Sequence, residues 1–159
     1  MKASSYLTLV RPIMEYAASV WDPYHLNDIL ALEKVQRRAA RWVMNDYSSY
    51  SSVSSMLNDL NWPSLHFRRR INRLQIFYKA IYNLSALTIP SYFTAVQRLT
   101  RHFHPLHFVI PSTRTTAHQQ SYFPRTIKDW NELPSYIIES NNLQSFTTSI
   151  INYYNFVHP

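Results

Sequence analysis

The chain contains no glycine in 159 residues, although average composition predicts about 11. Glycine supplies positive φ angles and close backbone approach, on which phosphate-binding loops, dinucleotide fingerprints and nucleophile elbows depend. The sequence therefore excludes those sites and argues against most enzymes that use nucleotides. Turns that need a positive φ must use Asn or Asp, and we expect them at Asn45, Asn61 and Asn83.

Cysteine is also absent, which excludes disulfides, cysteine-ligated zinc and thiol chemistry. The apolar residues near the N-terminus are interrupted by Arg11, Pro12 and Glu15, so they fit neither a signal peptide nor a membrane span. We therefore expect an intracellular protein, cytoplasmic or nuclear, that is not secreted and has no membrane partner. A basic amphipathic helix lying on an anionic membrane is a weaker alternative.

The net charge of +7 is concentrated in one part of the chain. The residues from Lys34 to Lys79 include nine basic and two acidic side chains, which accounts for the whole excess. An uncompensated cluster of this kind indicates a polyanionic partner. The alternative is a solvated helix face without a ligand, and the charges alone leave both interpretations open.

Hydrophobic periodicity predicts a mainly α fold, a compact bundle of about five helices. The first is expected over residues 5–21, where Pro12 either kinks the helix or marks its first turn. The last is expected to begin at a cap on Asn141 or Asn142 and to end near residue 154. The apolar face of the first helix is expected to consist of Leu9, Ile13, Tyr16, Val20 and Trp21.

The second helix is expected from a cap at Asn27 to about Asn45. A projection at about 100° per residue separates an apolar face from a narrow basic stripe nearly opposite. The apolar face comprises Leu32, Val35, Ala39, Trp42 and Val43, and the basic stripe comprises Lys34, Arg37, Arg38 and Arg41. Glu33 can pair with Arg37 at a spacing of four residues.

Residues 48–55 are rich in serine, which would fit a flexible linker, but a short helix is favoured over about residues 52–60, because apolar residues from Tyr47 and Tyr50 onward recur at helical spacing. A longer helix then begins at Pro63 or Ser64. Its core stripe is expected to be Phe67, Ile71, Leu74, Tyr78 and Ile81. Because a short connection can bring the two basic helices side by side, we expect their cations to contact nucleic-acid phosphates together. The candidates are Lys34, Arg37, Arg38, Arg41, Arg69, Arg70 and Arg73.

After residue 85 the sequence becomes rich in proline and threonine, with alternation over residues 104–110 that suggests one short β-hairpin. Pro124 then opens another helical turn. We therefore expect a basic helical domain over residues 1–85 and a loop-plus-helix segment over residues 86–159 that packs on it.

No residues with the spacing of a catalytic or metal site are found. Two-metal phosphoryl transfer needs clustered carboxylates, and the histidines are loosely spaced without an acidic partner. We expect no catalytic residues, metal, cofactor or small-molecule substrate. The aspartates considered are Asp22, Asp28, Asp46, Asp59 and Asp129, and the histidines are His102, His104, His107 and His118. For the aromatic side chains, core packing is expected rather than base stacking.

Four blocks of sequence, in this order, carry a resemblance to a known family. They are LVRPIMEYAASVWDP, LEKVQRRAARWVMNDY, SSVSSMLNDLNWPSLHFRRRINRL and SYFPRTIKDWNELP. Together they resemble the C-terminal region of reverse transcriptases from jockey-like non-LTR retrotransposons, over about residues 9–146. In that family a mostly helical thumb follows the palm. The resemblance implies a thumb-like grip on RNA or an RNA–DNA hybrid and a palm domain as a possible partner.

The chain departs from the family pattern at several positions. It has no counterpart of the catalytic Tyr/Phe-x-Asp-Asp motif, so the resemblance implies no polymerisation. Asn61 stands where relatives usually have Gly, and His66 and Phe67 replace an acidic pair, which leaves Ser64 without a capping-box partner. Two functions are therefore expected: a non-catalytic module that binds RNA or DNA backbone without sequence specificity, or an inert structural remnant of a decayed mobile element.

Overall fold

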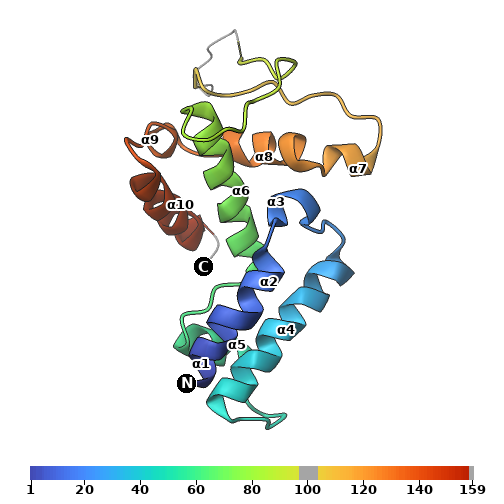
Figure 1. The fold of residues 1–159 in the computed structure, drawn as a ribbon, viewed down its shortest axis with the longest axis vertical. Coiled ribbons are helices and arrows are strands. Elements are labelled where there is room, and N and C mark those ends of the chain that lie inside the picture. The colour runs from blue at the N-terminus through green and yellow to red at the C-terminus, as the bar shows by residue number, and fades with distance from the viewer. Residues whose placement is uncertain (97–103, 158–159) are drawn as a thin grey trace. The chain divides into compact units, whose positions relative to one another are not determined.

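The computed structural model describes residues 1–96 and 104–157, and these residues are mainly helical (Figure 1). The chain divides into two compact units, Met1–Arg70 and Ile71–Pro159. The division lies inside helix α6 (Leu65–Ile81), whereas the sequence suggested a boundary at residue 85. The mainly α prediction is confirmed, and the described residues form more helical segments than the five expected.

The N-terminal helical region is interrupted twice. It consists of α1 (Lys2–Ser5), the π-helical turn η1 (Tyr6–Val10), α2 (Arg11–Glu15) and α3 (Ala18–Trp21). Pro12 lies in the first turn of α2, which is one of the two roles predicted for it. Ala17 then takes a left-handed conformation, with φ of 49°, so the prediction of one helix over residues 5–21 is wrong.

The apolar face predicted for this region is exposed to solvent. Its residues Leu9, Ile13, Tyr16 and Val20 are 67%, 75%, 80% and 86% exposed. The buried side chains are instead Tyr6, Met14 and Ala18. The reason is that a π-helical turn and a left-handed residue each change the phase of side chains along a helix, which a uniform 100° projection ignores.

Helices α4 (Leu26–Met44) and α5 (Val53–Asp59) complete the N-terminal part of the first unit. Helix α4 begins before Asn27, so the cap predicted at Asn27 was wrong. Helix α5 is capped by Ser52, whose Oγ accepts a hydrogen bond from the Ser55 N–H at 3.3 Å. The left-handed turns predicted at Asn45, Asn61 and Asn83 are confirmed, with φ of 54°, 53° and 53°. Asparagine thus fills the role that glycine usually has at helix ends.

The core of the first unit is organised around a buried glutamine on α4. Gln36 accepts a hydrogen bond from the Tyr6 hydroxyl at 3.1 Å and donates one to the Pro63 carbonyl at 2.9 Å. The Tyr6 ring stacks on Trp62 at a centroid distance of 4.6 Å. Burial raises the pKa of Tyr6 to about 12, so this phenol remains a neutral donor. These contacts fix which side of α4 faces inward and therefore which side faces solvent.

The N-terminus of α6 is capped by two side chains. Ser64 Oγ accepts a hydrogen bond from the Phe67 N–H at 3.1 Å, and Glu33 Oε1 accepts one from the His66 N–H at 2.8 Å. Glu33, on α4, thus satisfies a second backbone N–H in the first turn of α6, where the chain has no capping-box carboxylate of its own. It makes this bond and not the predicted ion pair with Arg37.

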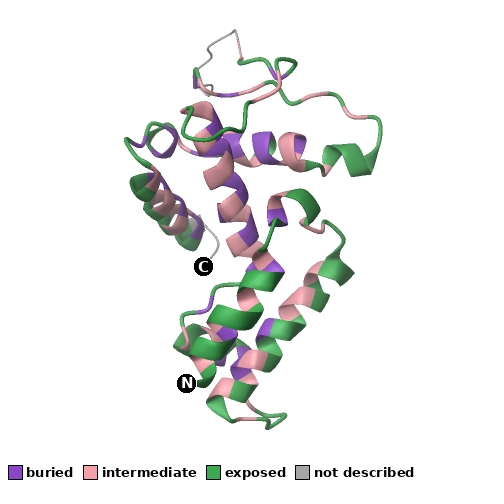
Figure 2. Cartoon of the chain, viewed as in Figure 1, coloured by how far each residue is buried: buried purple, intermediate pink, exposed green. Residues whose placement is uncertain are grey.

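The second unit has an aromatic core. It contains the C-terminal part of α6 with α7 (Thr116–Gln119), α8 (Tyr122–Asn131), α9 (Ser135–Ile138) and α10 (Leu143–Val157). Phe77 and Tyr78 of α6 contact Trp130 and Phe146 at centroid distances of 5.3 and 4.3 Å. Figure 2 shows these inward helix faces as buried. Asn142 caps α10 by accepting a hydrogen bond from Ser145, as predicted.

The β-hairpin expected after residue 85 is not supported. In residues 82–96 and 104–121, Ala95 and Phe108 form an isolated antiparallel bridge and no strand is present. The side chain of Asn131 bonds both backbone groups of Phe108, at 3.1 and 2.7 Å. The side-chain amide of Asn131 therefore satisfies two backbone groups of Phe108 that a neighbouring strand could otherwise pair. Residues 97–103 lie outside the described part of the chain.

No helix in the described ranges, residues 1–96 and 104–157, is both long and apolar enough to cross a membrane.

Candidate nucleic-acid interface

Three cations of α4 form an exposed row, here called the α4 basic stripe. It consists of Lys34, Arg37 and Arg38, which are all exposed. At about 100° per residue the three side chains lie within about 100° of arc and within about one helical turn of one another. Within the described residues none of them forms an ion pair. The buried Gln36 and Ala40 hold the other side of α4 against the core.

The fourth cation predicted on this helix has a structural contact. Arg41 is half-buried, and its Nη1 donates hydrogen bonds to the Ser48 carbonyl at 2.8 Å and to the Asp46 carbonyl at 3.4 Å. Hydrogen bonds from Ser51 and Ser48, with the nearby Arg41 charge, lower the pKa of Asp46. Arg41 therefore stabilises the loop after α4, and its guanidinium is already engaged in hydrogen bonds within the protein.

Arg69, predicted to face a phosphate, lies in the core of the first unit. Its side chain is 0% exposed, and its Nε donates to Asp22 Oδ1 at 2.7 Å. The guanidinium carbon lies 5.9 Å from the centre of the Trp21 ring, which is within the range of a cation–π contact. The expectation that Arg69 is exposed was wrong.

Arg73, in the second unit, is buried in the same manner. It forms an ion pair with Asp129, and its side chain is 3% exposed. The Tyr122 hydroxyl donates to the Arg73 carbonyl at 3.3 Å. The expectation of an exposed Arg73 was also wrong, while Arg70 is half-buried and engaged in other interactions.

Acids distant in the sequence therefore neutralise much of the basic cluster. Arg68 binds both oxygens of Glu15, including Nη2 to Oε2 at 3.0 Å, and this bond raises the pKa of Arg68. Asp22 and Asp129 form ion pairs with the buried Arg69 and Arg73. The structure does not form the seven-residue surface predicted from the sequence. It leaves the α4 basic stripe as the part of that prediction that is accessible to a ligand.

Two tyrosines in the loop that follows α4 were missed as functional candidates. Tyr47 and Tyr50 were expected to extend an apolar helical face, but they lie in the loop between α4 and α5 and are 65% and 98% exposed. Trp42 is 40% exposed, with the Lys2 ammonium 5.6 Å from the centre of its ring. The serines that flank both tyrosines were the available signal, because they favour loop over helix.

The histidines do not form a metal site in the part of the chain that the structure describes, where no group of three possible ligands is present. His104 Nε2 lies 2.8 Å from Glu139 Oε1, and its Nδ1 accepts a hydrogen bond from the Leu106 N–H. His107 packs beside it, and burial lowers the pKa of His107. His118 is exposed on α7, and His102 lies outside the described residues.

Comparison of the chain with protein-family models, with curated proteins and with solved structures gave no match.

Proposed function

We propose that this chain is a non-catalytic helical module that binds the phosphate backbone of nucleic acid without sequence specificity. The single observation that carries the proposal is the α4 basic stripe: three exposed cations, close together, without a carboxylate partner among the described residues. Lys and Arg bind phosphate oxygens by charge-assisted hydrogen bonds, which fix position but read no bases. The resemblance to a retrotransposon thumb supports the same ligand, RNA or an RNA–DNA hybrid, in the cytoplasm or nucleus.

Removing the stripe should weaken binding strongly. We expect the variant Lys34→Gln/Arg37→Gln/Arg38→Gln to bind an RNA–DNA hybrid about 10- to 100-fold more weakly than the natural chain at low salt, because three exposed charge contacts are lost. Fluorescence anisotropy with a labelled hybrid measures the affinity. A matched control, Lys79→Gln/Arg114→Gln/Lys128→Gln, removes the same charge from the second unit and should change affinity less than threefold. Equal losses in both variants would mean that only net charge matters.

A second candidate is an inert structural remnant. The observation in its favour is that the apolar side chains of Leu9, Ile13, Tyr16 and Val20 are exposed, since exposed apolar surface can mark an interaction site. In this interpretation these side chains once packed against a palm domain, and the basic stripe has no ligand. A chain that binds no polyanion at physiological salt would favour the remnant.

A further inference from the structure

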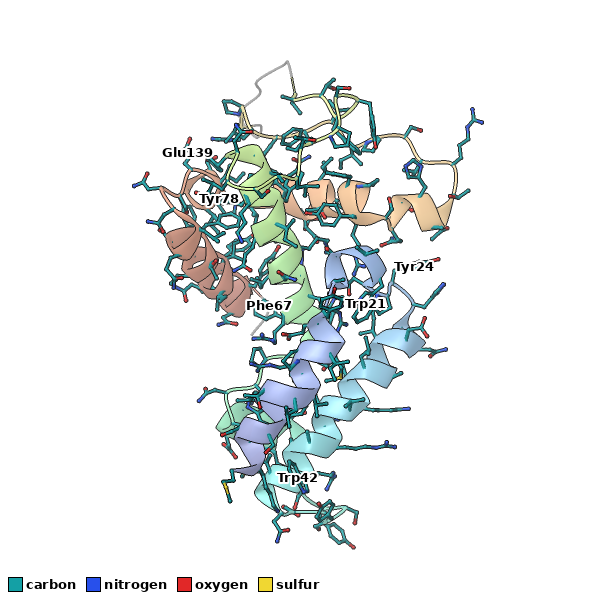
Figure 3. The ribbon with its side chains drawn as sticks, viewed as in Figure 1. Trp21, Tyr24, Trp42, Phe67, Tyr78 and Glu139 are labelled. Carbon is teal, nitrogen blue, oxygen red and sulfur yellow. The ribbon has the colours of Figure 1, made fainter. Side chains whose placement is uncertain are left out.

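The loop that carries Tyr47 and Tyr50 begins on the same side of α4 as the basic stripe. If Lys34 is placed at 0°, a period of about 100° per residue puts Arg41 and Asn45 within about 20° of it. The C-cap residue Asn45, where the loop begins, therefore lies on the same side of α4 as the stripe. Asn45 lies about 10 Å along the axis from Arg38. Figure 3 shows Trp42 at this end of α4.

Hydrogen bonds fix the backbone of this loop. The Ser48 N–H donates to Asp46 Oδ1 at 2.9 Å, the Tyr50 N–H to Ser48 Oγ at 3.2 Å and the Ser51 N–H to the Ser48 carbonyl at 3.4 Å. Arg41 joins the loop to the end of the stripe. The loop is thus held in place, yet it leaves both tyrosine rings open to solvent.

Exposed aromatic rings in the loop that follows the α4 basic stripe can stack on nucleobases. Burying an aromatic side chain is favourable by a few kcal/mol, so both rings retain surface that a ligand can cover. A nucleobase offers a flat face of the right kind, and stacking of this sort tolerates any base. In a duplex the base faces are already stacked on one another, so only unpaired bases can reach the tyrosines.

We propose that Tyr47 and Tyr50 stack on unpaired bases of a strand whose phosphates lie on the α4 basic stripe. The ligand is then single-stranded RNA or DNA, bound in preference to duplex. This inference rests on the proposed function, because the stripe supplies the phosphate contacts. It specifies the class of ligand that this site binds, which is single-stranded nucleic acid.

The test compares two single strands of equal length and charge, an oligothymidylate and its abasic analogue. The natural chain should bind the oligothymidylate about 10- to 100-fold more tightly, since stacking on two rings is lost with the abasic strand. Tyr47→Ala/Tyr50→Ala should lower the first affinity to that of the second and leave abasic binding unchanged. Tyr47→Phe/Tyr50→Phe should retain the preference because phenylalanine also stacks.

The outcomes separate the two proposals. Equal affinity of the natural chain for both strands would overturn base stacking, and weaker binding of both strands by the stripe variant would then leave backbone binding in place. No binding of either strand would overturn both. A loss of abasic binding in the alanine variant would assign the tyrosines to loop structure and overturn the inference. The comparison with the natural chain needs no variant, so it decides even if a variant fails to fold. An oligouridylate in parallel distinguishes RNA from DNA as the preferred strand.

Discussion

Replacement of Arg69 by Met is expected to lower the free energy of unfolding of this protein by about 3–5 kcal/mol. The substitution keeps most of the aliphatic packing but removes the ion pair between Arg69 and the Asp22 carboxylate, which is 7% exposed. Breaking a buried ion pair by removing one partner is among the most destabilising changes in a protein core. Chemical denaturation followed by circular dichroism measures the effect.

Two controls make this result specific. Arg37→Met is the same change at an exposed position and should alter stability by no more than about 0.5 kcal/mol. Arg69→Met combined with Asp22→Leu should recover most of the loss, because replacing both partners by apolar groups of similar size is often neutral. A loss for Arg69→Met as small as that for Arg37→Met would place Arg69 in solvent and restore it as a candidate phosphate ligand.

Trp130→Ala should destabilise the second unit by a similar amount, about 3–5 kcal/mol, because it leaves a large cavity. The side chain of Trp130 is 0% exposed and lies against Phe77 and Phe146 at centroid distances of 5.3 and 5.6 Å. Its indole N–H also donates to the Leu106 carbonyl at 2.9 Å. Denaturation combined with hydrogen exchange of peptides from α8 and α10 measures the loss in this unit.

The matched control for Trp130 is Phe156→Ala, since Phe156 is an aromatic residue of the second unit that is 86% exposed. It should change the free energy of unfolding by no more than about 0.5 kcal/mol. Trp130→Phe should give an intermediate loss, because the ring is retained and the hydrogen bond to Leu106 is not. An equally small effect of Trp130→Ala and Phe156→Ala would contradict the aromatic core described for the second unit.

Local rules predicted the local features of this fold. Without glycine, the left-handed helix ends fall on asparagine, and Asn45, Asn61 and Asn83 were expected for that reason. Ala17 adopts the same conformation without any local signal, because alanine normally favours the continuing helix. Its break and the π-helical turn before it explain why the apolar face of the first helix was assigned to the wrong side.

Long-range pairing explains what sequence reasoning missed at the candidate site. Asp22 and Asp129 lie 47 and 56 residues from the arginines that they bind, so a count of charges within one window could not include them. The α4 basic stripe was predictable because its geometry depends only on helix periodicity. The exposed tyrosines were overlooked, although the flanking serines favour a loop, because the spacing of Tyr47 and Tyr50 also fitted an apolar helical face.

The salt dependence of binding tests the central claim that the α4 basic stripe is the phosphate-binding surface. Each neutralised phosphate of a duplex contributes about 0.9 to the negative slope of log affinity against log salt. With three accessible cations, an RNA–DNA hybrid should give a slope of roughly −3, and the stripe variant a slope near zero. A slope near −6, or one that the variant leaves unchanged, would contradict this account.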